Sequence, residues 1–323
     1  MPLTFDLPLE QLKTYRGINP RPADFDQFWE DGLREMKAVN PDIELVPAGF
    51  QVPGVECLHL YFTGTGGARV HAKLLRPQHP SAPCPALLHF HGYACNSSDW
   101  SVRLNYAAQG FIVAALDCRG QGGSSEDKGG VIGNTLHGHI IRGLEDALAG
   151  KPEKLLFRQV FLDTAQLAGI LLAMPEVDPA RVFATGWSQG GALTVACAAL
   201  EPRIKKAAPV YPFLSDYKRV WEMDQARDAY LELREYFRLF DPQHQREDEV
   251  FEKLGYIDIQ NLAPRINADV LWGTGLMDTI CPPSSQFAAF NKIISKKRMV
   301  VFPDFAHEDL PGLPDEIMQF MLN

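Results

Sequence analysis

Residues 181–200 read RVFATGWSQGGALTVACAAL, and this stretch contains the strongest structural signal in the chain. Its first five residues form a short apolar run typical of a buried strand, and residues 192–200 are helix-like. Between them lies Gly186-Trp187-Ser188-Gln189-Gly190, a G-x-S-x-G sequence in the strand–turn–helix context that presents a serine for reaction. Close approach of backbone around such a turn leaves room only for glycine. We predict Ser188 to be a nucleophile; the alternative is a tight turn with a capping serine.

Short apolar runs on both sides of this stretch predict a buried β-sheet. They are often β-branched or aromatic, as expected of parallel strands covered on both faces. Helix-like segments separate most of them, the clearest at Leu155–Met174, where apolar residues recur at helical spacing. The runs are Ala86–Phe90, Phe111–Leu116, Arg181–Thr185, Ala207–Tyr211, Val270–Trp272 and Met299–Phe302. The alternation predicts a mostly parallel, doubly wound α/β sheet of the α/β-hydrolase type.

The remaining segments are assigned to the same domain, which spans residues 1–323. Residues 1–50 are predicted as an irregular arm with one helix near Ala23–Val39, followed by a hairpin of strands at 57–62 and 69–76. Residues 214–255 contain no strand-like run and are rich in charged and aromatic residues. We expect a helical insertion there, over the carboxyl edge of the sheet. A solvated surface helix is the alternative.

A serine hydroxyl needs a base and an orienting acid to act as a nucleophile, and hydrolases of this type carry them in the order Ser, Asp or Glu, His. Asp278 follows the strand run Val270–Trp272 and lies at the edge where functional residues of α/β sheets collect. Asp269 falls at the wrong end of that strand, and Asp304 is better explained by a local turn. The acid is therefore predicted to be Asp278.

The general base has few candidates. Only His244 and His307 follow the serine in the sequence, and His244 falls in the charged insertion. His307 comes shortly after the last strand run, at the same edge as Ser188 and Asp278. We predict His307 as the base.

An oxyanion hole needs two backbone N–H groups about 3 Å from the developing oxyanion. One is expected from Gln189, directly after the nucleophile, and the other from Tyr93, in the loop after an early strand. The pairs His89/His91 and His137/His139 make a zinc site conceivable, but no third ligand stands out and the triad needs no metal. No metal or other cofactor is predicted, and His91 is expected to support the oxyanion loop by hydrogen bonding.

A second glycine-rich loop, Asp117–Ser125, follows the strand run Phe111–Leu116. Its Arg119 could grip a carboxylate with both ends of its guanidinium and lock loops together. We prefer this structural role over direct substrate binding.

Charge and composition exclude several classes of partner. A net charge of −9 without a basic run argues against nucleic acid. No stretch approaches the roughly 20 apolar residues of a membrane span, and the N-terminus lacks the basic start and apolar run of a signal peptide. The six cysteines form no C-x-x-C pair and are expected to be reduced, mostly buried thiols. We expect a cytoplasmic protein with neither nucleic acid nor a membrane as partner.

Several longer blocks resemble the acetyl xylan esterases and cephalosporin C deacetylases of carbohydrate esterase family seven. They extend over nearly the whole chain: Arg119-Gly120-Gln121, GHIIRGLED from Gly138, FLDTAQLA from Phe161, the 186–190 elbow, PVYPFLSDYKR from Pro209, GLMDTICPPS from Gly275 and His307-Glu308. The resemblance implies an intracellular enzyme that deacetylates short xylo-oligosaccharides and cephalosporin C. It also implies a homohexamer, a dimer of trimers. Trp187 departs from the family, which more often has glycine there.

The expected reaction is transfer of an acetyl group to Ser188 and then to water. Tyr93, Trp187, Pro212 and Ile280 are predicted to bound a small acyl pocket, on the basis of their closeness in sequence to catalytic groups. A prolyl-oligopeptidase-like peptidase shares the fold and triad but usually needs a large extra domain. The pattern is also compatible with a broad short-chain carboxylesterase, or with a binding protein built on an inactive hydrolase fold.

Overall fold

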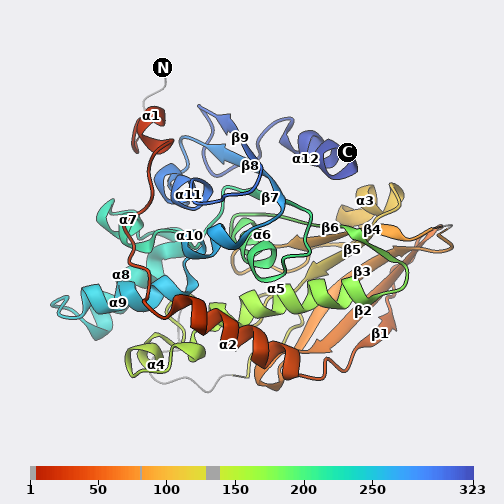
Figure 1. Cartoon of the computed structure of the whole chain (residues 1–323), viewed down its shortest axis with the longest axis horizontal. Coiled ribbons are helices and arrows are strands. Elements are labelled where there is room, and N and C mark those ends of the chain that lie inside the picture. Colours follow the sequence, from red (N-terminus) through yellow and green to blue (C-terminus); the bar gives the residue numbers. More distant parts are fainter. Residues whose placement is uncertain (1–4, 81, 129–138) are drawn as a thin grey trace.

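The computed structural model describes residues 5–80, 82–128 and 139–323. Within them, nine strands form one sheet in the order β1-β2-β3-β5-β4-β6-β7-β8-β9 (Figure 1). The strands are β1 (Glu44–Pro47), β2 (Val55–Thr63), β3 (Arg69–Pro77), β4 (Cys84–Phe90), β5 (Ile112–Leu116), β6 (Val177–Trp187), β7 (Lys206–Val210), β8 (Asp269–Gly275) and β9 (Lys297–Phe302). All six predicted apolar runs, and both strands of the predicted hairpin, are strands of this sheet.

The strands from β5 to β9 are parallel, and β1, β2 and β3 join them through antiparallel pairs. The register aligns the carboxyl ends of the parallel strands: Phe90 pairs with Gly186, Gly186 with Pro209, and Gly275 with Phe302. Loops that leave these strands therefore meet at one edge. The predicted mostly parallel α/β-hydrolase sheet is confirmed.

Helices cover both faces of the sheet. They are α1 (Leu9–Leu12), α2 (Phe25–Ala38), α3 (Leu104–Ala108), α4 (Leu144–Leu148), α5 (Leu156–Ala173), α6 (Gln189–Leu200), α7 (Tyr217–Glu222), α8 (Leu231–Phe240), α9 (Glu247–Leu254), α10 (Ile259–Leu262), α11 (Pro283–Phe290) and α12 (Leu313–Leu322). The larger apolar core, the first core cluster, lies between the sheet and α2, α5, α6 and α11. A second core cluster lies on the other face, under α3 and α12 (Figure 1).

Helix α5 is the most apolar long helix of the described chain. It has the length and composition of a membrane span, but 78% of it is buried inside the structure, as in the core helix of a globular domain. The sequence reading did not anticipate that this segment would meet the length and hydropathy criteria for a span. Its bounds agree with the predicted helix to within one residue at each end.

The N-terminal arm is more ordered than expected. The helix near Ala23–Val39 is present as α2, but residues 1–50 also contain α1 and the edge strand β1. All four residues of β1 are exposed, so the strand shows no burial alternation that a sequence reading could detect. The predicted irregular arm is wrong at this point.

The segment 214–255 is helical, as predicted, and contains α7, α8 and α9. It is not only a solvated surface layer, because many of its apolar residues, among them Leu233, Phe237 and Phe251, are buried in the first core cluster. Through α8 it reaches the loop that follows β4 at the carboxyl edge of the sheet.

Candidate active site

Ser188 lies at the turn between β6 and α6 with φ 57° and ψ −120°. This left-handed conformation is strained for a residue with a side chain and is held by the surrounding backbone. A Cβ on Gly190 would lie 2.1 Å from the carbonyl oxygen of Phe90, and one on Gly186 would lie 2.5 Å from backbone atoms of Gly190. The predicted steric need for glycine on both sides of the serine is therefore confirmed.

Two backbone N–H groups are in place to serve as oxyanion donors. Gln189 begins helix α6 directly after Ser188, so its N–H belongs to the positive end of the helix dipole. Tyr93 lies in the loop after β4. Within the described part of the chain, neither of these N–H groups donates a hydrogen bond to another protein group. Their role in catalysis stays a prediction, but both donors are free for an oxyanion.

His91 supports the loop that carries Tyr93. Its Nε2 accepts from the N–H of Cys118 at 3.0 Å, so the proton resides on Nδ1, which donates to the carbonyl oxygen of Gly92 at 2.7 Å. Burial lowers the pKa of His91, in accord with this neutral tautomer. The supporting role predicted for His91 agrees with this geometry.

Asp278 and His307 are brought together from two different loops. Asp278 is fully buried in the turn after β8, where its Oδ1 accepts from the N–H groups of Ile280 at 2.9 Å and Cys281 at 2.8 Å. Its Oδ2 lies 2.8 Å from Nδ1 of His307. An ionised carboxylate only accepts, so Nδ1 carries the proton and Nε2 is left as the basic nitrogen.

Cys281 connects this pair to Ser188. The Ser188 hydroxyl is within hydrogen-bonding reach of the Cys281 thiol. The sulfur in turn lies within 4.8 Å of potential ligand atoms of Asp278 and His307. The Ser188 hydroxyl makes no hydrogen bond to His307 in the described structure, and such contacts are often long in free enzymes. Burial raises the pKa of the Cys281 thiol well above its usual range, so the thiol is neutral and a poor nucleophile beside the serine.

The imidazole of His307 also packs on an aromatic ring. The ring of Tyr211 lies 4.5 Å from it, centroid to centroid, at an interplanar angle of 52°. Tyr211 follows β7 and donates its N–H to the carbonyl oxygen of Gly273 on β8, so the ring is fixed to the sheet. This contact limits the orientations that the base can adopt.

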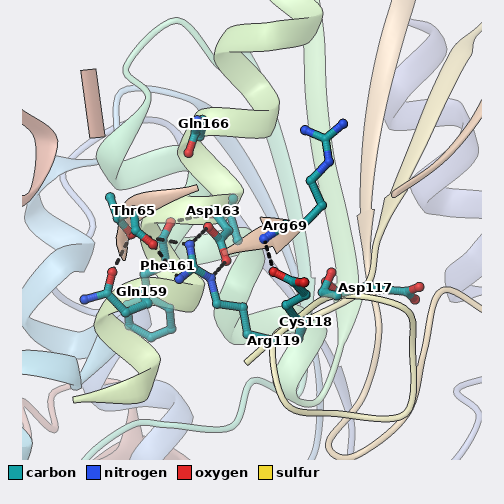
Figure 2. A network of polar contacts seen from close by, with 12 residues as sticks. Thr65, Arg69, Asp117, Cys118, Arg119, Gln159, Phe161, Asp163 and Gln166 are labelled. Atoms are coloured by element: carbon teal, nitrogen blue, oxygen red, sulfur yellow. Dashed lines mark hydrogen bonds and ion pairs between the residues drawn. The ribbon is translucent and has the colours of Figure 1, made fainter. Parts of the chain in front are cut away.

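The loop that carries Arg119 is anchored in the protein interior (Figure 2). Nε of Arg119 donates to Asp163 on α5 at 2.5 Å, and a second guanidinium nitrogen donates to the other carboxylate oxygen at 2.6 Å. The remaining terminal nitrogen reaches the carbonyl oxygen of Thr65 at 2.8 Å. Arg119 is 4% exposed, so the structural role preferred for it agrees with its position.

Gln121, two residues further on, joins this loop to both halves of the predicted oxyanion hole. Its side-chain amide exchanges two hydrogen bonds with that of Gln189, at 2.8 and 2.9 Å. Its Oε1 also accepts from the N–H of Ala94 at 3.0 Å, next to Tyr93. The loop that Arg119 fixes in the interior thus carries Gln121, whose side chain contacts both the turn at Ser188 and the loop that contains Tyr93.

The four residues predicted to bound an acyl pocket pack against different parts of the core. Tyr93 and Ile280 pack against the first core cluster, whereas Trp187 packs against the second, on the opposite face of the sheet. There the Trp187 ring stacks on His89 at 5.6 Å. Pro212 is buried behind the start of α6. That these four residues bound one acyl pocket stays a prediction.

Groups that could ligate a metal are few in the residues that the structure describes. Asp278, Cys281 and His307 are close enough in space, but Asp278 and His307 already share a hydrogen bond that a cation would have to replace. His91 uses both ring nitrogens in hydrogen bonds. His137, of the second pair, lies outside the described residues. The sequence prediction of no metal is untested by this arrangement.

Sequence reasoning missed two functional candidates besides Gln121. Cys281 lies three residues after the predicted acid. Glu232, on α8, accepts a hydrogen bond from the Tyr93 hydroxyl at 2.7 Å. Its signal was a carboxylate on the same helical face as Leu233 and Tyr236, which the charged composition of the insertion concealed. Five of the six cysteines are buried and all six are free; Cys95 is exposed.

Comparisons with known proteins agree over the whole chain. The sequence model of the family described as acetyl xylan esterase (AXE1) matches residues 1–323. The structure of acetyl xylan esterase 1 from Thermoanaerobacterium sp. JW/SL YS485 superposes with a TM-score of 0.96 at 59% identity, covering 98% of both chains. An acetyl xylan esterase from Paenibacillus sp. R4 gives 0.92 at 31% identity, covering 98% of this chain and 99% of that one.

A curated relative, acetyl esterase Axe7A of Xylanibacter ruminicola, is 25% identical over 308 residues. The match takes in 92% of this chain but 65% of that protein, slightly less than two thirds of its length.

Proposed function

The chain belongs to the acetyl xylan esterase family and is a carboxylic ester hydrolase, and on that premise we propose that it removes acetyl groups from acetylated xylo-oligosaccharides through Ser188, His307 and Asp278. The observation that carries the mechanism is the buried contact between Asp278 and His307, which leaves the basic Nε2 of the imidazole unpaired in the described structure. Two backbone N–H groups that have no hydrogen-bond partner among the described residues belong to Tyr93, in the loop after β4, and to Gln189, at the start of α6.

In the first half of the proposed cycle, the Ser188 hydroxyl attacks the acetyl carbonyl while Nε2 of His307 takes its proton. The N–H groups of Tyr93 and Gln189 bind the oxyanion that forms. The imidazolium then gives its proton to the sugar oxygen, the ester bond breaks and the alcohol leaves. Asp278 stays ionised and stabilises the imidazolium. Loss of one such oxyanion donor typically costs about 2.7–4 kcal/mol of barrier.

In the second half, a water molecule gives a proton to His307 and adds to the acetyl-enzyme. The same two N–H groups bind the second oxyanion. The imidazolium returns its proton to the Ser188 oxygen as the acyl bond breaks, and acetic acid leaves and ionises to acetate in the solvent. Cephalosporin C carries its acetyl group as an ester of the same kind, and we include it as a proposed second substrate.

Two other reaction classes use the same side chains. A prolyl-oligopeptidase-like enzyme would cleave amides, and a broad carboxylesterase would accept longer acyl chains. Acetate release from acetylated xylo-oligosaccharides and cephalosporin C, compared with hydrolysis of p-nitrophenyl butyrate, p-nitrophenyl octanoate and a proline amide, separates these classes. The proposal fails if the amide or the longer esters are preferred over acetyl esters, or if Ser188→Ala retains activity.

Assembly and location remain parts of the same proposal. A hexamer of this chain has six times the 36.0 kDa mass of the monomer, which light scattering coupled to size exclusion distinguishes from a dimer or trimer. A cytoplasmic location is proposed from the reduced state expected of the six thiols, and cell fractionation tests it.

A further inference from the structure

Glu232 is a buried carboxylate that the proposed mechanism does not use. It lies on α8 in the helical insertion and is 3% exposed. Burial raises its pKa to about 7, and the hydrogen bonds that it accepts offset only part of this effect. Within the described residues, no arginine, lysine or histidine side chain forms an ion pair with it. Burial of a carboxylate without an oppositely charged partner costs folding free energy, and a purely structural contact could use a neutral side chain instead.

Donors from two separate loops converge on this carboxylate. The Tyr93 hydroxyl donates to Oε1 at 2.7 Å, and the backbone N–H of His139 donates to the same oxygen at 3.1 Å. The N–H of Ile141 donates to Oε2 at 2.9 Å. Glu232 therefore ties the oxyanion loop and the segment before α4 to one point on α8.

Ring contacts reinforce this arrangement. The ring of Tyr93 meets that of His139 edge to face at 5.0 Å and that of Phe213 at 5.5 Å. Phe213 donates its N–H to the carbonyl oxygen of Ser188. The Tyr93 side chain is thus held between the segment that Glu232 fixes and the turn that carries the nucleophile.

The backbone of Tyr93 is braced on its other side by His91 and Gln121, through hydrogen bonds to Gly92 and Ala94. Those bonds hold the neighbours of Tyr93 but not Tyr93 itself. In the described part of the chain, the Tyr93 side chain is held through its hydroxyl, which donates to Glu232. An oxyanion donor needs placement within about 0.5 Å, and a displacement of about 1 Å can cost about 100-fold in rate.

We propose that Glu232 is a positioning residue for the oxyanion hole, acting from the helical insertion through the Tyr93 hydroxyl to set the place of the Tyr93 backbone N–H. This inference rests on the proposed esterase function. The helical insertion then takes part in catalysis, because Glu232 on α8 holds Tyr93, which provides one of the two oxyanion donors.

A double-mutant cycle tests the proposal with p-nitrophenyl acetate as substrate. Glu232→Gln removes the charge and replaces one of the two accepting oxygens with an amide N–H₂ group, and Tyr93→Phe removes only the hydroxyl while keeping the backbone N–H. We expect each variant to lower kcat by about tenfold or more with KM changed by less than about twofold, because the oxyanion exists only in the transition state. The double variant should be no slower than the slower single one, because both changes act on the same contact.

The chain offers a matched structural control. The Tyr236 hydroxyl on the same helix donates to Glu145 on α4 at 2.6 Å, a contact of the same kind that does not touch the oxyanion loop. Tyr236→Phe should lower the thermal midpoint and leave kcat within about twofold.

The possible failures are distinguishable. Equal losses of kcat in Tyr236→Phe and Glu232→Gln, fully multiplicative losses in the double variant, or a change in KM alone would overturn the positioning role. If Glu232→Gln does not fold, an unchanged kcat in Tyr93→Phe is sufficient to reject it. Activity that survives in Ser188→Ala would instead remove the proposed function on which this inference depends.

Discussion

The buried pair of Arg119 and Asp163 gives a quantitative prediction about stability and the site. Their side chains are 5% and 1% exposed, and two short hydrogen bonds join them. Removal of one partner from such a pair typically costs about 3–5 kcal/mol, because a charge is left buried without compensation. Asp163→Asn should therefore lower the free energy of unfolding by about that amount, since arginine cannot lose its proton to escape the cost.

Arg119→Met should behave differently as the pH changes. Burial raises the pKa of Asp163 even beside Arg119, and loss of the arginine raises it further, so the orphaned carboxyl takes up a proton as the pH falls. A folded-state pKa above the unfolded value adds stability at low pH that is lost as the pH rises through it. The free energy of unfolding that Arg119→Met loses relative to the native chain should accordingly become smaller as the pH falls. The loss in Asp163→Asn should not become smaller.

Urea unfolding, followed by tryptophan fluorescence across a pH series, measures these differences. The double variant Arg119→Met/Asp163→Leu should be more stable than the sum of the single losses predicts, because it leaves no buried charge. Additive losses, or a cost below about 1 kcal/mol for Asp163→Asn, would refute this reasoning.

Three further predictions concern the elbow, the triad and a second buried carboxyl. Asp278→Asn should reduce kcat by about 10⁴-fold with little change in the folded structure, measured on an acetyl ester, because His307 loses its orientation and tautomer; a loss below tenfold contradicts the triad. Gly190→Ala should yield little folded protein or displace Ser188, because the new Cβ would lie 2.1 Å from the oxygen of Phe90; native expression with native activity contradicts this. Burial raises the pKa of Asp258 to about 7. The free energy of unfolding of the native chain should therefore rise by up to about 4 kcal/mol relative to that of Asp258→Asn as the pH falls from 8 to 4. Urea unfolding measures the difference, and a difference that stays constant with pH contradicts the prediction.

The sheet could be predicted because its central strands are buried on both faces and therefore appear as apolar runs. Each predicted site residue follows one of those runs, so the carboxyl edge gathers Ser188, Asp278 and His307 from distant parts of the sequence. The exposed edge strand β1 had no such pattern. Its four residues gain their conformation from pairing with β2, which is a long-range contact.

Two features of the site were not accessible to sequence reasoning for physical reasons. The prediction that Trp187 bounds the acyl pocket used closeness in sequence, which does not indicate the face of the sheet on which a side chain lies; its ring packs against the second core cluster. Glu232 belongs to a charged helix, and its hydrogen-bond partners Tyr93 and Ile141 lie 139 and 91 residues away in the sequence. The helical face that it shares with Leu233 and Tyr236 was the only local signal of its burial, and that signal does not identify its partners.

The central claim is that the hydroxyl of Ser188 becomes acylated, and identification of the modified residue tests it most directly. The enzyme would be quenched in acid within the burst of p-nitrophenyl acetate hydrolysis, digested, and mapped by mass spectrometry. The account predicts a stoichiometric acetyl group on the peptide that contains Ser188, and none in Ser188→Ala. An acetyl group on Cys281, whose thiol lies beside that hydroxyl, or an unlabelled enzyme that still turns over, would contradict it.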